Sequence, residues 1–384
     1  MNITNNIYYI GVNDKNIDLF EGQYKIKNGM AYNSYLINDE KTAIMDTVEK
    51  SFGIEWISNI EYILQGKAPD YLVIQHMEPD HSANIGLFME KYPDAVIVSG
   101  TKSFPMIKQF FGTDYNDRMI AVNEGDILNL GSHTLTFINA PMVHWPEVIM
   151  SYESNTKTLF SADGFGKFGT IDTNEEWVDE ARRYYIGIVG KFGVQVQNVL
   201  KKAANLQIER ICALHGPVLT DNLGYYINLY DKWSSYTPEE DGVLIAYSSV
   251  YGNTEEAVML LKDELDKLNY KNVKVMNLTR CDIHEAVAQA FKYSKMVLAS
   301  TTYNGGLFPC MKEFLNHLTE RAYKNRKIGI IENGSWAATV DKNIKKTLET
   351  SAGITFFDTL VSIKSKANDE NKDQIKKLAK EIAE

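Results

Sequence analysis

Beyond residue 242, short apolar runs alternate with amphipathic helical segments, and this alternation constrains the fold more than any other feature of the sequence. Neighbouring parallel strands need helical crossovers between them. This region is therefore predicted to form a doubly wound parallel five-stranded sheet, an α/β arrangement. The expected strands lie at residues 243–247, 273–278, 296–300, 327–331 and 354–360, and the expected helices at 254–268, 283–291, 309–323, 341–350 and from 369 onward.

The first part of the chain has many short apolar runs separated by polar turns. This spacing is typical of packed sheets. Helical periodicity at residues 83–92 and 178–206 places helices between the strands. We therefore expect an α/β domain built on packed sheets. The apolar runs are residues 42–45, 71–75, 95–98, 135–138, 158–160 and 211–214.

The two parts meet at a polar, acidic stretch, residues 234–241, which contains Pro238 and lacks apolar periodicity. Such a stretch is typical of a linker. A chain of 384 residues is long enough for two domains that each bury a core. We predict one domain at residues 1–238 and a second at residues 239–384.

Composition narrows the choice of partners and compartment. The formal net charge is −10 and no cluster of Lys and Arg stands out, which argues against nucleic-acid binding because phosphate recognition needs clustered cations. Cys212, Cys281 and Cys310 are widely spaced and form no C-x-x-C pair, which favours a reducing compartment. No apolar run is long enough to cross a membrane. We expect a cytoplasmic protein without a membrane anchor.

Seven potential metal ligands lie just past short apolar runs. If the strands run in compatible directions, their ends share one rim and the seven side chains meet. Four imidazoles and three carboxylates divide into two sets of two His and one carboxylate, with one carboxylate left as a bridge, a pattern typical of non-haem iron. The seven are His76, Glu78, Asp80, His81, His144, Asp163 and His215.

The other histidines, His133, His284 and His317, have no acidic partners in register and are expected to be structural. A single His after a strand is more often a core or surface residue than a ligand, so the hypothesis depends on the joint pattern. Asp46 ends the run at 42–45. It either supports a ligand through a hydrogen bond or caps a helix or turn.

The segment from His76 to His81 resembles the metallo-β-lactamase motif H-x-H-x-D-H in its flavodiiron form, H-x-E-x-D-H, with Glu78 where hydrolases have a second His. A carboxylate in that place favours iron over zinc. The resemblance implies an αββα sandwich for this domain. It also implies a ligand assignment: His76, Glu78 and His144 for one iron, Asp80, His81 and His215 for the other, and Asp163 between them.

A hydroxyl- and glycine-rich loop follows the expected strand at 243–247 and leads into a helix, where backbone amides suit a phosphate. It lacks the G-x-G-x-x-G and P-loop patterns. It is similar to the flavodoxin phosphate loop S/T-x-T-G-x-T, from which Tyr251 departs. Its residues are Ser248, Ser249, Val250, Tyr251, Gly252, Asn253 and Thr254.

Two further loops follow the third and fourth expected strands, where a flavodoxin-like sheet contacts its flavin. Glycines allow close approach of the backbone, and aromatic rings allow stacking. Three suitable loops at three strand ends predict an FMN site, although ordinary turn chemistry is the alternative. The residues are Thr301, Thr302, Tyr303, Asn304, Gly305 and Gly306 in one loop, and Asn333, Gly334, Ser335 and Trp336 in the other.

Taken along the whole chain, the sequence resembles a flavodiiron protein, a metallo-β-lactamase-like domain followed by a flavodoxin-like domain. The resemblance implies an enzyme that reduces dioxygen to water, nitric oxide to nitrous oxide, or both, at a diiron centre that FMN re-reduces. It also implies a head-to-tail homodimer or a dimer of dimers. The electron donor would be rubredoxin or a similar protein, or a deazaflavin.

Two other functions remain open at this stage. One is a zinc hydrolase fused to a flavodoxin-like electron carrier, against which Glu78 argues. The other is a redox sensor or electron carrier that binds both cofactors without turnover. The ligands do not distinguish dioxygen from nitric oxide as the preferred substrate.

Overall fold

The computed structural model describes the backbone of residues 1–384 and every side chain except that of Asn116. Its contacts divide the chain into two compact units, Met1–Asp231 and Lys232–Glu384. Half of the stretch expected as a linker is regular structure, because helix α7 (Leu223–Ser235) covers its first two residues and strand β17 (Glu240–Tyr247) covers its last two. Among the described helices, none is both long and apolar enough to cross a membrane.

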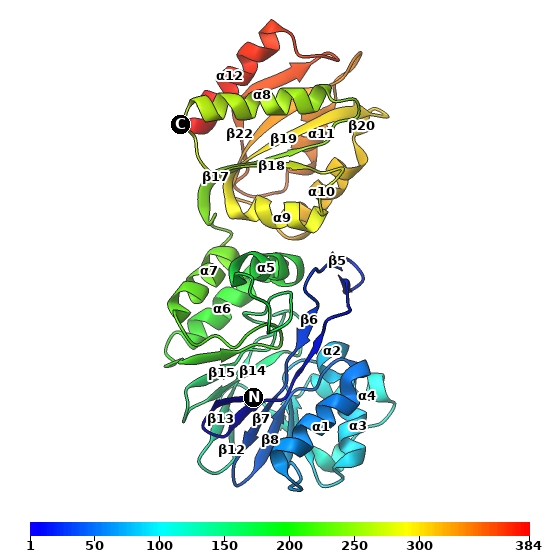
Figure 1. Cartoon of the computed structure of the whole chain (residues 1–384), viewed down its shortest axis with the longest axis vertical. Coiled ribbons are helices and arrows are strands. Elements are labelled where there is room, and N and C mark those ends of the chain that lie inside the picture. Colours follow the sequence, from blue (N-terminus) through cyan, green and yellow to red (C-terminus); the bar gives the residue numbers. More distant parts are fainter. The chain divides into compact units, whose positions relative to one another are not determined.

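The first unit is an αββα sandwich, as predicted (Figure 1). One sheet has the strand order β1-β2-β7-β8-β9-β10-β11 and the other the order β12-β13-β14-β15-β16. The first sheet contains β1 (Asn2–Thr4), β2 (Ile7–Tyr9), β7 (Tyr35–Asn38), β8 (Thr42–Met45), β9 (Tyr71–Ile74), β10 (Val96–Gly100) and β11 (Met119–Val122). The second contains β12 (Ile127–Asn129), β13 (Thr134–Asn139), β14 (Ile149–Glu153), β15 (Thr158–Phe160) and β16 (Arg210–Cys212).

Short strands and helices complete this unit. Strand β3 pairs with β6, and β4 pairs with β5. The bounds are β3 (Val12–Asp14), β4 (Leu19–Phe20), β5 (Tyr24–Lys25), β6 (Met30–Tyr32), α1 (Gly53–Leu64), α2 (Pro79–Ser82), α3 (Ile85–Lys91), α4 (Ser103–Phe111), α5 (Trp177–Tyr184) and α6 (Gly193–Ala203).

Side-chain alternation along the strands creates two cores in this unit. Successive residues of a strand point to opposite faces. Leu36 and Ile44 therefore join Trp56 of α1 in the core beneath the helices. Their neighbours Ile37 and Met45 join the core between the two sheets, to which both sheets contribute. The first sheet is therefore apolar on both faces. One face packs against a layer of helices and the other against the second sheet.

The helix expected at residues 178–206 is interrupted. Helix α5 passes into a π-helical turn, Tyr185–Val189, and a 3-10 turn, Gly190–Phe192, before α6 begins. The hydroxyl of Tyr24 donates to the carbonyl oxygen of Gly187 at 2.9 Å. A Cβ at Gly187 would lie 2.7 Å from the Tyr24 ring, so the glycine leaves room for this ring. Because Tyr24 is far away in the sequence, the helical pattern at residues 178–206 does not reveal the contact.

The second unit is a parallel sheet of order β18-β17-β19-β21-β22 with helices on both faces (Figure 1). In chain order this is 2-1-3-4-5, and the order reverses between β17 and β19. Strand β20 pairs with the end of β19 in antiparallel fashion. The bounds are α8 (Asn253–Lys267), β18 (Val273–Asn277), α9 (Ile283–Lys292), β19 (Tyr293–Tyr303), β20 (Gly306–Leu307), α10 (Pro309–Glu320), β21 (Lys327–Asn333), α11 (Val340–Thr347), β22 (Thr355–Ile363) and α12 (Asp369–Ala383).

Arg326 joins separate segments of the second unit. Its buried guanidinium donates to the carbonyl oxygens of Tyr293 at 2.7 Å, Tyr236 at 2.7 Å and Phe291 at 2.5 Å. We predict that Arg326→Leu lowers the free energy of unfolding of this unit by about 2–4 kcal/mol, because buried carbonyl groups lose their donor. Hydrogen exchange on the full chain should show reduced protection within residues 232–384. Arg280→Leu, at an exposed position, is the control and should leave protection unchanged.

Candidate functional site

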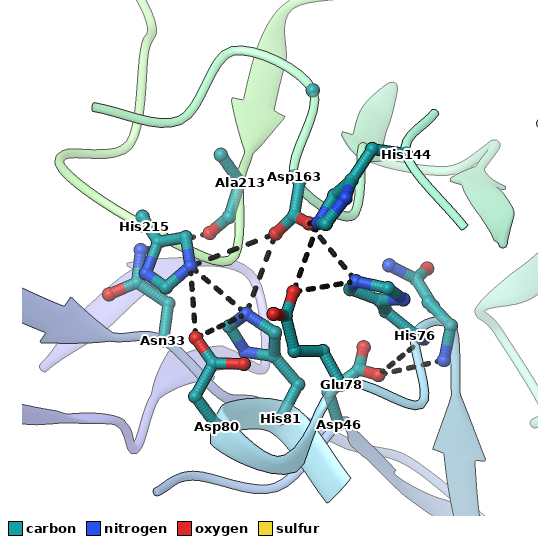
Figure 2. A network of polar contacts seen from close by, with 12 residues as sticks. Asn33, Asp46, His76, Glu78, Asp80, His81, His144, Asp163, Ala213 and His215 are labelled. Carbon is teal, nitrogen blue, oxygen red and sulfur yellow. Dashed lines mark hydrogen bonds and ion pairs between the residues drawn. The ribbon is translucent and has the colours of Figure 1, made fainter. Parts of the chain in front are cut away.

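Loops from both sheets of the first unit meet at one edge of the sandwich (Figure 2). His76 follows β9, and α2 begins three residues later. His144 lies between β13 and β14, Asp163 follows β15, and His215 follows β16. The structure brings all seven predicted metal ligands together, in two groups.

The first group contains His76, Glu78, His144 and Asp163, each of which offers a ligand atom within 4.8 Å of the others. The Nε2 atoms of His76 and His144 lie 3.2 Å and 2.9 Å from Glu78 Oε2. Both nitrogens also lie 3.2 Å from Asp163 Oδ2. Two imidazoles and two carboxylates therefore point at one space.

The second group contains Asp80, His81 and His215. The Nε2 atoms of His81 and His215 are 3.0 Å apart and lie 3.3 Å and 3.4 Å from Asp80 Oδ2. They lie 3.4 Å and 3.7 Å from Oδ1 of Asp163. The Asp163 carboxylate thus presents one oxygen to each group.

Hydrogen bonds alone do not satisfy this cluster. Among the side chains that the structure describes, both carboxylate oxygens of Asp80 and of Asp163 are buried without a hydrogen-bond partner. The Nε2 atoms of His81 and His215 face each other at 3.0 Å, so only one of the two can carry a proton. Buried charges need a partner or a metal ion. The donor set of imidazoles and carboxylates fits two cations and suits iron.

The groups in the cluster shift one another's pKa. Burial raises the pKa of Asp163, but the charge of His76 and the close contacts with the imidazoles hold it well below its usual range. Burial lowers the pKa of His144, yet the close contact with Asp163 and the hydrogen bond to Glu78 outweigh this and raise it to about 9. The pKa of Asp163 is lowered and that of His144 is raised for the same reason, which is that the carboxylates attract positive charge.

Glu147 orients one of the ligands. Its Oε1 accepts hydrogen bonds from His76 Nδ1 and from the backbone N–H of Met77, both at 2.9 Å. His76 therefore directs its Nε2 into the first group. A carboxylate that holds the second nitrogen of a ligating His is common in metal sites. The sequence interpretation did not identify this role, for which the spacing of Glu147 three residues after His144 is the only local signal.

Asp46 supports the same ligand segment through the backbone. Its Oδ1 accepts the N–H groups of Gln75 at 2.7 Å and His76 at 3.2 Å. Burial raises the pKa of Asp46 to about 8, which these hydrogen bonds oppose. Of the two roles left open for Asp46, the structure shows the contact with a ligand-bearing segment, made to the main chain rather than to the imidazole.

Aromatic rings surround the imidazoles. The rings of Phe20, Tyr32 and Tyr184 lie 5.6 Å, 6.0 Å and 5.4 Å from that of His215. The ring of Trp145 lies 5.3 Å from that of His76. These contacts hold the imidazoles in place, and Phe20 and Tyr32 also line an open pocket that Glu78 and Asp80 border.

The remaining histidines lie outside both groups. His133 was expected to lack an acidic partner, and this was wrong, because its Nδ1 lies 3.2 Å from Oε1 of the buried Glu153. Strand pairing between β13 and β14 creates this pair, since the two residues are far apart in sequence. The rings of His284 and His317 lie 4.9 Å apart in the second unit.

The loops expected to bind the flavin lie at the ends of β17, β19 and β21, which are neighbours in the sheet. Two expectations need correction. The segment after residue 300 is not a simple loop, because β19 continues through Tyr303 and pairs with β20. Asn333 is the last residue of β21 rather than part of the following loop.

The first of these loops ends at the start of α8. Ser249 Oγ accepts the N–H groups of Gly252 at 3.2 Å and Glu255 at 3.3 Å. Gly252 precedes α8 with φ +91°. Tyr251 and Trp336 are 93% and 94% exposed, so both rings are available for contacts.

The flavin-loop residues differ in burial. Ser248, Thr254 and Asn333 are buried; Ser249, Asn253, Thr301, Thr302, Gly306 and Gly334 are half-buried; Val250, Tyr251, Gly252, Tyr303, Asn304, Gly305, Ser335 and Trp336 are exposed.

An αββα unit with a cluster of metal-ligating side chains, followed by a 2-1-3-4-5 parallel sheet, defines a class of two-domain proteins that join a metallo-β-lactamase fold to a flavodoxin fold. Residues 30–216 match the ODP family beta lactamase, and residues 244–379 match the flavodoxin domain family. The chain is 30% identical over 381 residues to the anaerobic nitric oxide reductase flavorubredoxin of Vibrio vulnificus (strain YJ016), covering 95% of this chain and 75% of that protein.

Solved structures agree with this class. Rubredoxin oxygen:oxidoreductase from Desulfovibrio gigas superimposes with a TM-score of 0.91 at 25% identity, covering 100% of this chain and 97% of that one. The flavodiiron protein from Giardia intestinalis has a TM-score of 0.89 at 25% identity, with 99% and 96% covered. The chain belongs to the flavodiiron protein family.

The contact between Glu147 and His76 is testable through metal affinity. We predict that Glu147→Leu weakens metal binding by about 10–100-fold, because the His76 ring loses the acceptor that orients it. Glu147→Gln keeps an acceptor oxygen and should lose much less. Metal titration of both variants, with the exposed Glu90→Leu as a control, measures the difference. Equal affinities for the Leu variant and the native chain would contradict the role of Glu147.

Proposed function

We propose that the chain is an oxidoreductase that reduces dioxygen to water, nitric oxide to nitrous oxide, or both, at a non-haem diiron centre re-reduced by FMN. The observation that carries this proposal is the position of Asp163, with one carboxylate oxygen toward His76 and His144 and the other toward His81 and His215. A carboxylate so placed serves two metal ions at once. The relatives named as a nitric oxide reductase and as a rubredoxin oxygen:oxidoreductase support both substrates.

The ligand assignment follows the two groups. His76, Glu78 and His144 hold one iron ion, and Asp80, His81 and His215 hold the other. Asp163 bridges them. The distances of 2.9–3.7 Å among these donor atoms support the assignment, because such donors turn toward shared space instead of toward separate partners.

When bound, the two iron ions and FMN supply the electrons of the reaction. Each ferrous ion yields one electron and reduced FMN yields two, which matches O₂ + 4 H⁺ + 4 e⁻ → 2 H₂O. The reduction 2 NO + 2 H⁺ + 2 e⁻ → N₂O + H₂O requires half as many. The chain's own contribution is to hold the ligands with Glu147 and Asp46 and to pack aromatic rings around His215.

We further propose that FMN binds across the ends of β17, β19 and β21. Ligands of doubly wound sheets bind where the strand order reverses, which here is between β17 and β19. The backbone amides at the start of α8 suit the flavin phosphate. Trp336 and Tyr303 are exposed at the neighbouring strand ends, where they are available to stack on the ring system.

The remaining proposals concern partners and organisation. The domain boundary lies at residues 238/239. Electrons arrive from rubredoxin or a similar protein, as the name of the Desulfovibrio gigas relative suggests, or from a deazaflavin. The protein acts in the cytoplasm as a head-to-tail homodimer or a dimer of dimers, in which the FMN of one subunit serves the metal centre of another.

The proposal is tested on purified protein loaded with its cofactors. Elemental analysis should find about two iron ions and one FMN for each chain. Steady-state consumption of each gas, with an excess of reductant, then compares dioxygen with nitric oxide. A protein that retains only zinc would instead be the hydrolase alternative. Bound iron and FMN with no gas consumption would indicate a sensor or electron carrier.

The second metal group gives a direct mutational test. We predict that His81→Asn removes or weakens the iron of the second group and reduces turnover by at least about 100-fold, since a metal ligand is lost, while FMN binding is unchanged. Iron content, flavin absorbance and gas consumption are measured together. His317→Asn, in the second unit, is the control and should retain iron and turnover. Full activity with intact iron in His81→Asn would refute the ligand assignment.

The flavin loop is tested at Gly252, which has φ +91° and open space around its Cα. We predict that Gly252→Ala weakens FMN binding by about tenfold, because a side chain disfavours the loop conformation that places the amides around the phosphate. Gly66→Ala, with φ +96° and equally open surroundings in the first unit, is the matched control. Titration of the flavin-free proteins with FMN should show a loss of affinity in the first variant alone.

A further inference from the structure

An apolar cavity of about 120 Å³ lies in the first unit and is lined by residues of the second sheet and of helices α6 and α7. The sheet contributes Met150 of β14, Leu159 of β15 and Ile211 of β16. Their neighbours Ile149, Phe160 and Cys212 belong to the core between the two sheets, so side-chain alternation turns these three residues outward, toward the helices.

The inner end of the cavity adjoins the segments that carry the metal ligands. Val143, which directly precedes His144, lines it, and so do Gly164 and Phe165, which directly follow Asp163. Phe165 is held there by Tyr230, whose ring stacks on it at 4.1 Å and whose hydroxyl accepts its backbone N–H at 2.5 Å. The cavity is therefore lined by residues next in sequence to one predicted ligand in each of two loops.

The other end of the cavity approaches the surface. Val143, Leu159 and Ile211 are buried at the inner end. Ala203 at the end of α6 is half-buried, and Ala204, which follows it, is exposed. The lining residues of the ligand-bearing loops are thus buried, whereas those at the end of α6 are more exposed.

The lining determines what the cavity holds. Of the residues that line it, Tyr230 alone carries a hydroxyl, and this group already accepts a hydrogen bond. Water in a cavity needs two or more polar partners, whereas apolar cavities of similar size stay dry and bind xenon. A small apolar molecule is the occupant that this lining favours.

We propose that the cavity binds dioxygen or nitric oxide and supplies the gas to the metal centre. This inference rests on the proposed function, because only a gas-consuming centre gives the cavity a use. Both gases are small, weakly polar diatomic molecules and gain by leaving water for an apolar space. The cavity stores gas next to the loops of His144 and Asp163, while Phe165 and Tyr230 form its inner wall.

The first measurement is independent of activity. Crystals of the native protein exposed to pressurised xenon should show a xenon atom in the cavity beside Met150 and Val196. Ala203→Phe places a ring in the cavity and should remove that atom. A native cavity without xenon would overturn the proposal, whatever the turnover of the enzyme.

The second measurement is kinetic and separates the two gases. In Ala203→Phe, with iron and FMN contents at native levels, the KM for the gas should rise at least about threefold while kcat is unchanged, since supply and not chemistry is impaired. Val199→Phe, also in the lining, should act in the same way if Ala203→Phe does not fold. Val194→Phe, exposed on α6 outside the lining, is the matched control.

The outcomes distinguish the cavity from the proposed function. Unchanged KM values for both gases in the filled variants would overturn the supply role while the function stands. A raised KM for one gas only identifies that gas as the one supplied. A native, fully loaded enzyme that consumes neither gas would overturn the proposed function and the supply role together, even with xenon in the cavity.

Discussion

The electrostatic balance around Asp163 is the interaction on which the rest of the first unit depends. One buried carboxylate faces four imidazole nitrogens, two on each of its oxygens, at 3.2–3.7 Å. Burying such groups is unfavourable unless charge of opposite sign is present. The shifted pKa values of Asp163 and His144 express the same demand for positive charge. Metal ions would meet that demand, and their binding would then stabilise the folded loops.

The sandwich makes this concentration of ligands possible. The loops after β9, β15 and β16 reach one edge of the sandwich from both sheets, and the two cores hold those sheets in register. Glu147 and Asp46 then fix the segment that carries His76. The second sheet turns apolar residues outward beneath α6, and residues next to His144 and Asp163 in the ligand-bearing loops also line the apolar cavity there.

The second unit follows a different physical rule. Its proposed ligand site is set by the order of the strands and not by a cluster of charged side chains. The strand order reverses between β17 and β19, so the helices that follow these two strands diverge and leave space between them. Loops at that point present backbone amides, Gly252 and exposed aromatic rings. Such loops suit a phosphate and a flat ring system, whereas the side-chain cluster of the first unit suits cations. The proposed function needs both, since metal ions that exchange single electrons require a nearby two-electron store.

By itself, the sequence determined the order and type of most elements, because the period of the apolar residues reports which faces are buried. The strand at 42–45 matches β8 in both bounds, and every strand and helix expected beyond residue 242 is present within a few residues. The joint pattern of four imidazoles and three carboxylates after apolar runs also predicted the seven side chains that the structure gathers into two groups. Only the tertiary structure decided which oxygen of Asp163 faces which group, that Glu147 orients His76, and that Tyr24 contacts the π-helical turn at Gly187. These features join residues far apart in the chain, and no local periodicity records such contacts.

The cavity beneath α6 is likewise a property of packed layers, since it is the space left between side chains of β14, β15, β16 and two helices.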